Sequence, residues 1–369
     1  MDPNAIGFNN EGVISEVVST IDLEGVLKIA KKYNINGIMT IASDKPVRTV
    51  AYVGEKLGLN TVTAETAIRA TNKAVMRDCL KEADVPIPRY YKVKDLSQYL
   101  EIINSFNINC IVKPSDNSGS RGIYLVKDVN DRQDVLKAYN YSMKNSSDGY
   151  ILVEEYMEGA EVSVECICID NKCNVIQITD KLTTGAPFFV EMGHNEPSML
   201  SIKIQNEIKK IAINAVQAVG ISNGAAHVEI KVTNEGPKIV ELGARLGGDN
   251  ITTHLVPLST GVDMVESCIK IALNEKPDIT IKFDKGSAIR YFKSEKGIIK
   301  KIYGLEEAKN SKGIKQVSIV HNEGEKINDI HSSIDRVGFV IAQGEDPKEA
   351  IKCCEEALKK VKIKIIKGC

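Results

Sequence analysis

The sequence predicts a mixed α/β and α+β fold, because helical and strand patterns alternate along all of its 369 residues. Near the start, residues 23–33 have the spacing of an amphipathic helix, and residues 37–41 form a short apolar run that is typical of a strand. Residues 161–170 alternate between polar and apolar side chains, as expected for a strand with one buried face. A chain of this length should form two or three compact units.

Composition favours a small-molecule substrate. The chain has 48 basic and 49 acidic side chains and a net charge of −1, so no global field attracts nucleic acid or an anionic membrane. Its apolar runs fall short of the about 20 residues that a transmembrane helix needs, and its first residues do not resemble a signal peptide. We therefore expect a cytoplasmic protein whose nine cysteines are reduced and mostly packed.

Capping and turn residues bound the expected helices. A second helix is predicted over residues 47–57, because Gly58 is a typical C-terminal stop. Together with the strand at 37–41 it indicates part of an open parallel sheet. Thr71 or Asn72 can cap a further helix, which two prolines end after residue 83. Later helices are expected over residues 131–143, 203–219 and 347–360.

A polar loop over residues 115–122 follows the strand pattern at 110–113. Strand patterns at 123–126 and 150–155 come after it. Small residues in the loop let backbone N–H groups approach an anion, and Lys113 adds a positive charge at its base. The loop therefore indicates a phosphate-binding site, with a surface hairpin as the alternative.

The clearest chemical signal is a pair of carboxylates on a predicted hairpin. Two strand patterns flank the three-residue loop Asn234–Gly236, which is a common hairpin closure. A turn centred on Glu235 places Glu229 opposite Glu241, with Cβ atoms roughly 4.5–5.5 Å apart. Two such carboxylates repel, and one tends to take up a proton unless a cation is present. Mg²⁺ is often held by one or two carboxylates plus substrate phosphates, and two solvated glutamates are the alternative.

A glycine-rich turn, Gly243–Asp249, follows the second carboxylate. Gly247 and Gly248 beside Arg245 would let backbone and guanidinium meet a phosphate or carboxylate together. A tight turn with a surface arginine is the alternative. The sequence contains no Gly-x-x-x-x-Gly-Lys loop, Gly-x-Gly-x-x-Gly fingerprint or His-Glu-x-x-His pattern, which disfavours P-loop NTPases, Rossmann dehydrogenases and zincins.

In order and spacing, these pieces resemble the ATP-grasp superfamily over nearly the whole chain. The motifs that carry the resemblance are Asn72-Lys73-x-x-Met76-Arg77 with Pro86-x-Pro88, Ile111–Pro114 with its loop, Val153–Ser163, His227-x-Glu229 and Glu241-x-Gly243-x-Arg245. Thr179-Asp180-Lys181 and Phe189–Ser198 are similar to the carbamoyl-phosphate-synthetase-like and L-amino acid ligase branch. Asp335–Val340 resembles the closing domain of the glycinamide ribonucleotide synthetase group.

The resemblance implies three parts. These are a shortened N-terminal parallel-sheet domain over residues 1–70, an ATP-grasp domain over 71–284 and a small C-terminal domain over 285–369. The ATP-grasp domain would hold ATP between two α+β subdomains, of which the smaller covers about residues 88–157. Relative to the family, about one β-α-β unit of the first domain is expected to be absent, because the domain is short or the chain begins late. A second copy of the chain, in a homodimer, would cover the sheet edge left bare.

The same motifs imply the site residues. Those expected to bind the nucleotide are Lys73, Lys113, Ser118, Gly119, Ser120, Glu154, Glu155, Met157, Glu161 and Lys181. Among them, the lysines 73 and 113 would contact phosphates, the Glu154 carboxylate the adenine, and Glu161 the ribose. Glu229 and Glu241 would hold Mg²⁺, with Mn²⁺ as the alternative metal. Arg245, His194 and Lys113 would serve catalysis.

One departure concerns the metal site. Many members have Asn two residues after the second metal glutamate, where this chain has Gly243. A water or Asp249 would replace that ligand, or a second metal would be held more weakly.

The resemblance implies an ATP- and Mg²⁺-dependent ligase that joins a carboxylate to an amine through an acyl phosphate, releasing ADP and phosphate. Both substrates would be small molecules. The alternatives are an enzyme that phosphorylates bicarbonate or carbamate, as carboxylases and carbamoyl phosphate synthetases do, and a nucleotide-binding regulatory protein.

Overall fold

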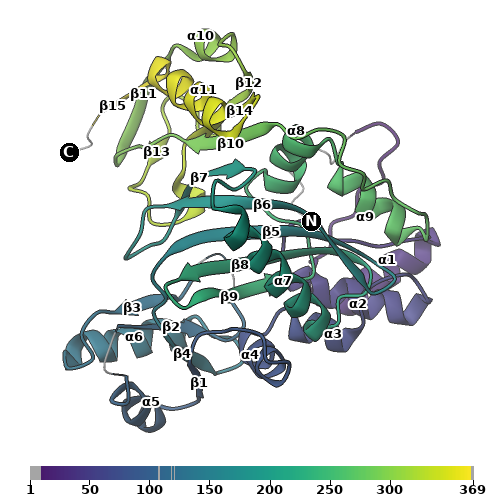
Figure 1. Cartoon of the computed structure of the whole chain (residues 1–369), viewed down its shortest axis with the longest axis vertical. Helices are drawn as coiled ribbons and strands as arrows, with labels where there is room; N and C mark the ends of the chain where they lie inside the picture. Colours follow the sequence, from purple (N-terminus) through teal and green to yellow (C-terminus); the bar gives the residue numbers. More distant parts are fainter. Residues whose placement is uncertain (1–9, 107–108, 118, 120, 367–369) are drawn as a thin grey trace.

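The computed structural model describes residues 10–106, 109–117, 119 and 121–366. In these residues, a small sheet, a large central sheet and a three-stranded C-terminal sheet are covered by helices (Figure 1). The mixed α/β and α+β class is therefore confirmed. Two of the expected nucleotide-binding residues, Ser118 and Ser120, lie outside the described residues.

The N-terminal part is helical. It contains α1 (Leu23–Tyr33), α2 (Lys45–Leu57) and α3 (Ala64–Arg69). As expected, Gly58 ends α2, with a φ of 67° in the left-handed region.

The strand expected at residues 37–41 is wrong, because the described residues form no strand there. A strand needs a neighbour for its backbone hydrogen bonds, and this segment packs on non-strand backbone instead. A Cβ on Gly37 would lie 2.7 Å from the Ala272 carbonyl oxygen. The Ile41 carbonyl accepts from the Leu246 amide at 2.9 Å. The described N-terminal residues therefore contain no parallel sheet and no bare sheet edge.

The small sheet is antiparallel and has the strand order β1-β4-β2-β3. Its strands are β1 (Tyr90–Val93), β2 (Cys110–Pro114), β3 (Tyr124–Val126) and β4 (Ile151–Glu155). The helices α5 (Leu96–Ile103) and α6 (Arg132–Lys144) enclose an apolar core with it. Helix α4 (Lys73–Glu82), which Asn72 caps through two backbone amides, leads into this unit.

The central sheet has eight strands in the order β12-β14-β10-β7-β6-β5-β8-β9. In chain order these are β5 (Ala160–Ile169), β6 (Lys172–Thr183), β7 (Glu191–Glu196), β8 (Gly224–Thr233), β9 (Gly236–Gly243), β10 (Gly286–Tyr291), β12 (Ile314–Ile319) and β14 (Gly338–Gly344). Figure 1 shows it running through the middle of the molecule, above the small sheet.

Helices cover both faces of the central sheet. The apolar residues of β5 beginning at Val162 pack with α7 (Ile202–Val219). Ile167 on the opposite face packs in a second core with the π-helical turn η1 (Ile251–Leu255), α8 (Val256–Thr260) and α9 (Met264–Ala272). The predicted alternation of β5 is confirmed, and it directs Glu161 and Glu165 away from α7.

The hairpin β8–β9 pairs Glu229 with Glu241, as predicted. Its loop differs from the prediction, because Thr233 already pairs with Gly236 and the turn is one residue shorter. A bulge on β9 between Ile239 and Glu241 adds the residue back. The two differences cancel, so the carboxylates face each other.

The C-terminal part extends the central sheet with β10, β12 and β14, which α11 (Pro347–Lys360) covers. A three-stranded sheet of β11 (Gly297–Tyr303), β13 (Lys326–Ile327) and β15 (Lys362–Ile366) completes it. The short helices α10 (Leu305–Lys309) and η2 (Ser333–Asp335) lie in its connections. Across the part of the chain that the structure describes, we find no helix with the length and apolar character to cross a membrane.

Candidate active site

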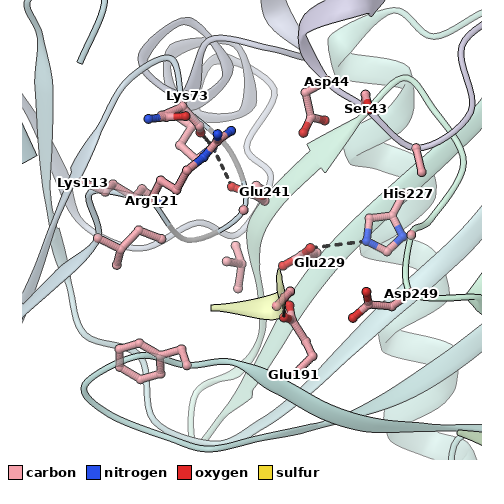
Figure 2. A pocket seen from close by; sticks show the side chains of 18 of the residues that line it. Ser43, Asp44, Lys73, Lys113, Arg121, Glu191, His227, Glu229, Glu241 and Asp249 are labelled. Atoms are coloured by element: carbon pink, nitrogen blue, oxygen red, sulfur yellow. Dashed lines mark hydrogen bonds and ion pairs between the residues drawn. The ribbon is translucent and has the colours of Figure 1, made fainter. Parts of the chain in front are cut away.

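A cleft of about 610 Å³ lies at the junction of the small sheet, the central sheet and the N-terminal segment (Figure 2). Every expected site residue that the structure describes lines it. They are Lys73, Lys113, Gly119, Glu154, Glu155, Met157, Glu161, Lys181, His194, Glu229, Glu241 and Arg245. Residues from β2, β4, β5, β6, β8 and β9 therefore meet in one place, although they are far apart in the sequence.

A buried ion pair network forms the small-sheet side of the cleft. The Glu154 carboxylate is 2.7 Å from Lys113 Nζ and 2.7 Å from Arg77 Nε. Arg77 is fully buried and also donates to the Val240 carbonyl at 2.6 Å, which ties α4 to the bulge of β9. Burial raises the pKa of Glu154, but the charges of Arg77 and Lys113 outweigh it and bring the pKa to about 2.

Neighbouring residues of β4 are also engaged. The Glu155 amide donates to the Arg89 carbonyl at 2.9 Å, and the Glu155 carboxylate is 2.8 Å from Lys238 Nζ. The Glu154 and Glu155 side chains are thus held by cations on both sides of the strand. The C-terminal end of β4 is thereby fixed in place where it lines the cleft.

Lys181 is the centre of the opposite wall. Its Nζ lies 2.9 Å from Glu161, 3.0 Å from Glu229 and 3.5 Å from Glu191. Burial lowers the pKa of Lys181, but the three carboxylates outweigh it and raise the pKa well above its usual value. Lys231 adds a second cation to Glu161 at 2.8 Å.

Behind Glu229 lies a buried carboxylate–imidazole pair. His227 Nδ1 is 2.7 Å from Glu165, which is fully buried, and His227 Nε2 is 3.3 Å from Glu229. Burial lowers the pKa of His227, but the two glutamates raise it to about 9. Glu229 thus lies between two cations, and its pKa is held well below the usual value despite its burial.

Glu241 has its own cation, because Lys73 Nζ lies 2.8 Å from its carboxylate (Figure 2). Lys73 also donates to the Asn117 carbonyl of the loop at 2.8 Å. The two carboxylates were expected to repel unless a cation is present, and here a lysine lies beside each of them. Lysines from α4 and β6, invisible in the hairpin's own sequence, neutralise the pair.

The two glutamates fit a metal that is shared with a ligand. Among the residues that the structure describes, no three or more His, Cys, Asp or Glu side chains are arranged to hold a metal ion by themselves. Two opposed carboxylates that both point into the cleft (Figure 2) suit Mg²⁺, which takes its remaining ligands from phosphates and water.

The far end of the cleft contains two arginine–aspartate pairs. Arg245 Nε is 2.6 Å from Asp44, which lies at the start of α2. Arg336 from the C-terminal part holds Asp249 with two bonds of 2.7 Å. His194 is almost fully buried, and its Nε2 is 3.4 Å from the same Asp249 carboxylate.

Sequence reasoning missed the partners of the site residues. Arg77 follows Lys73 by one helical turn, and this spacing could have indicated that both face one side. Arg336 lies in a motif quoted for the resemblance, but without a role. Glu191 likewise lies in a quoted motif, Phe189–Ser198, without a role. Asp44 comes from a segment with no pattern of its own, so nothing in the sequence pointed to it.

Two stretches of the chain match known domain families. Residues 106–253 match the ATP-grasp domain, and residues 290–365 match the L-amino acid ligase C-terminal domain 2. The alanine–anticapsin ligase of Bacillus subtilis strain 168 is 26% identical over 269 residues, which cover 68% of this chain and 56% of that protein. The L-arginine-specific L-amino acid ligase of Bacillus subtilis is 24% identical over 300 residues, which cover 79% of this chain and 71% of that protein.

A solved structure agrees with these matches. The L-amino acid ligase from Bacillus licheniformis superposes with a TM-score of 0.82 at 23% identity, covering 93% of this chain and 84% of that chain. At this identity the likeness shows the fold. The two matching domains show that the chain contains an ATP-grasp domain followed by the C-terminal domain 2 of the L-amino acid ligases.

Proposed function

We propose that this chain is a carboxylate–amine ligase that uses ATP and Mg²⁺, activates the carboxylate as an acyl phosphate, and releases ADP and phosphate. The observation that carries the proposal is the charge arrangement in the cleft. Lys73, Lys181 and Arg245 surround the opposed pair Glu229 and Glu241, so anions and a cation can both be received there.

In this proposal, nucleotide binding exchanges partners within the network. Glu229 and Glu241 would hold Mg²⁺, which would supply positive charge next to the phosphates. Lys73 and Lys181 would then lose their carboxylates to the metal and become available to phosphate oxygens. The exchange leaves each charge paired, so the site need not bury an uncompensated ion.

The chain's own groups would support the transfer mainly by position and charge. A carboxylate is a poor electrophile because oxide would have to leave, whereas an acyl phosphate offers phosphate as the leaving group. Lys113 and Arg245 lie in the cleft as fixed cations that can stabilise charge on the moving phosphoryl group. The Ser115–Gly122 loop would exclude water from the activated intermediate.

The substrates in this proposal are an amino acid or dipeptide-sized carboxylate and an amine. The names of the similar proteins, an L-arginine-specific L-amino acid ligase and an alanine–anticapsin ligase, favour this class. The far end of the cleft suits it chemically, because Glu191 can attract an ammonium group and Arg245 a carboxylate. His194 lies beside Asp249, where the acceptor would arrive.

Two measurements test the proposal. First, ADP with Mg²⁺ should raise the melting temperature, since a ligand of the folded state stabilises it. Lys113→Ala should reduce this shift, and Lys94→Ala, an exposed lysine of the same subdomain, should leave it unchanged. No shift in the wild-type protein at millimolar nucleotide would refute the nucleotide site.

Second, ADP release should be screened against single and paired amino acids, other small carboxylates and bicarbonate. ADP as the product, formed only with an amino acid or other carboxylate, supports the ligase. Release driven by bicarbonate would assign the chain to the bicarbonate-phosphorylating class. AMP as the main product would overturn γ-phosphoryl transfer, and nucleotide binding without turnover on any substrate would indicate a regulatory protein.

A further inference from the structure

Gly243 is where this chain departs from the expected metal-binding pattern, and the structure shows what occupies the vacant space. A Cβ built on Gly243 would lie 3.0 Å from Asp44 Oδ1 and 3.1 Å from Arg245 Cγ. Gly243 does not have a left-handed φ, so it is the missing side chain that matters and not the backbone conformation. An Asn at this position would occupy the space of the Asp44–Arg245 pair.

The Asp44–Arg245 pair joins segments 201 residues apart. Asp44 Oδ1 is 2.6 Å from Arg245 Nε, and Asp44 Oδ2 is 3.3 Å from Nη2. This two-point contact fixes the plane of the guanidinium, which a single contact would not do. Asp44 precedes α2 but makes no capping hydrogen bond with its side chain, so the helix does not use the carboxylate.

Asp249, the other acid near this turn, is already committed. Both of its oxygens bind Arg336 at 2.7 Å, and one of them faces His194. It is therefore not the group that fills the space beside Gly243. Figure 2 shows Asp44 and Asp249 as separate acids in the cleft, with Asp44 reaching it from the N-terminal segment.

Arg245 lies among three carboxylates, so the one with which it pairs determines where its guanidinium points. Asp44, Glu229 and Glu241 all raise its pKa against the effect of burial. Without Asp44, the guanidinium would lose the two-point contact that fixes its plane and could turn toward Glu229 or Glu241. Asp44 supplies an acid outside the opposed pair, so Arg245 remains near the site without blocking it.

We propose that Asp44 is a positioning residue that aims Arg245 at the transferred phosphoryl group, and that Gly243 is required because it leaves room for this pair. The inference rests on the proposed function, since it assigns Arg245 to that group. Under this proposal, the N-terminal segment contributes a residue, Asp44, to the active site.

The test compares binding of MgADP with binding of MgADP plus aluminium fluoride, which mimics a phosphoryl group in transfer. Titration calorimetry on the full chain gives both affinities. Asp44→Asn should leave MgADP affinity within about 2-fold, and should reduce the tightening caused by aluminium fluoride roughly 10-fold or more, as loss of a preorganised charge does. Gly243→Asn should have the same effect by displacing Asp44, although it restores the more usual residue.

A double-mutant cycle with Arg245→Ala shows whether Asp44 acts through Arg245. Under the proposal, Asp44→Asn/Arg245→Ala loses no more tightening than Arg245→Ala alone. Independent effects of the two changes would overturn it, as would wild-type tightening in Asp44→Asn or Gly243→Asn.

Mn²⁺ binding in the presence of ADP, measured by electron paramagnetic resonance, distinguishes a positioning role of Asp44 from a role as metal ligand. Unchanged Mn²⁺ affinity in Asp44→Asn supports positioning, and a loss of 10-fold or more would make Asp44 a metal ligand and overturn the proposal. A wild-type protein that binds no MgADP would refute the proposed function itself, which is a different result from failure of the Asp44 arm.

Discussion

Single carboxylates in the cleft are each matched to a cation that comes from another element. Glu241 on β9 has Lys73 of α4, and Glu229 on β8 has Lys181 of β6. These cations offset the charge of the acids in the absence of a metal. A substitution that removes one acid therefore leaves a lysine without its partner in a mostly buried place.

Glu241→Gln tests this at one position. We expect turnover to fall by roughly 100-fold or more, because a charge that supports the transfer is lost. We also expect the free energy of unfolding in EDTA to fall by about 1–2 kcal/mol, because Lys73 loses its charged partner. Glu235→Gln in the same hairpin is the control, since Glu235 is exposed and its pair with Lys238 is weak. Wild-type turnover of Glu241→Gln at limiting Mg²⁺ would show that the site is misassigned.

Glu154 predicts a pH dependence. Its pKa is about 2 in the folded protein, below the usual 4.5, so its contribution to stability is complete above about pH 4.5 and is lost as pH falls toward 2. Glu154→Gln should cost roughly 3–5 kcal/mol at pH 7, because Arg77 and Lys113 stay buried without a carboxylate. The difference in free energy of unfolding between the wild type and Glu154→Gln, measured by urea unfolding, should be smaller by about 1 kcal/mol at pH 3.5 than at pH 7. A difference that stays constant between these pH values contradicts the ion pair.

At the scale of an element, the turn after β9 contains two adjacent glycines, Gly247 and Gly248, whose surroundings differ. A Cβ on Gly247 would lie 2.7 Å from Glu165 Oε2 and 2.8 Å from His227 Nδ1, both buried. A Cβ on Gly248 would meet only Ala42 at 4.0 Å. Gly247 thus lets the turn close over the Glu165–His227 pair.

The matched pair Gly247→Ala and Gly248→Ala tests this packing. Gly247→Ala should lower the free energy of unfolding by roughly 1–3 kcal/mol, because the buried pair has to move. Gly248→Ala should stay within about 0.5 kcal/mol of wild type. Thermal unfolding of both variants decides the point, and equal melting temperatures would mean that the turn adjusts freely.

Much of the element pattern could be predicted because local chemistry determines it. The helix Pro347–Lys360 has the expected bounds, and Gly58 ends α2 as expected. In the hairpin, the register at Glu229 and Glu241 was predicted correctly only because the short turn and the bulge at Val240 cancel. The bulge could not be predicted, because its cause is distant: the Val240 carbonyl accepts from Arg77 on α4.

The errors share this physical origin. Residues 37–41 have the composition of a strand, but a strand exists only where another strand pairs with it, and here Gly37 packs on Ala272. The ion pairs of the site are likewise long-range, as Asp44 with Arg245 shows. The resemblance of the motifs predicted which groups line the cleft, whereas their partners depend on the assembled fold.

At the scale of the whole molecule, one arginine ties the C-terminal part to the cleft. Arg336 donates to Asp249, to the Glu191 carbonyl at 3.0 Å and to the Ser333 carbonyl at 2.9 Å. Its guanidinium also lies 3.8 Å from the ring centre of Tyr291. These contacts join the segment before β14 to β7 and to the turn that follows β9.

Arg336→Ala should therefore destabilise the contact between the C-terminal part and the cleft more than it destabilises either of them alone. We expect a loss of roughly 2–3 kcal/mol in the free energy of unfolding, since Asp249 and two carbonyls lose their donor. Hydrogen exchange should rise in residues 331–337 and around Asp249, and stay unchanged in the small sheet of residues 90–155. Arg336→Lys is the control, because it keeps the charge but cannot make the two-point contact. Its free energy of unfolding should lie between those of the wild type and Arg336→Ala. Unchanged exchange in residues 331–337 of Arg336→Ala would show that the apolar core beneath β14 alone holds the C-terminal part to the cleft.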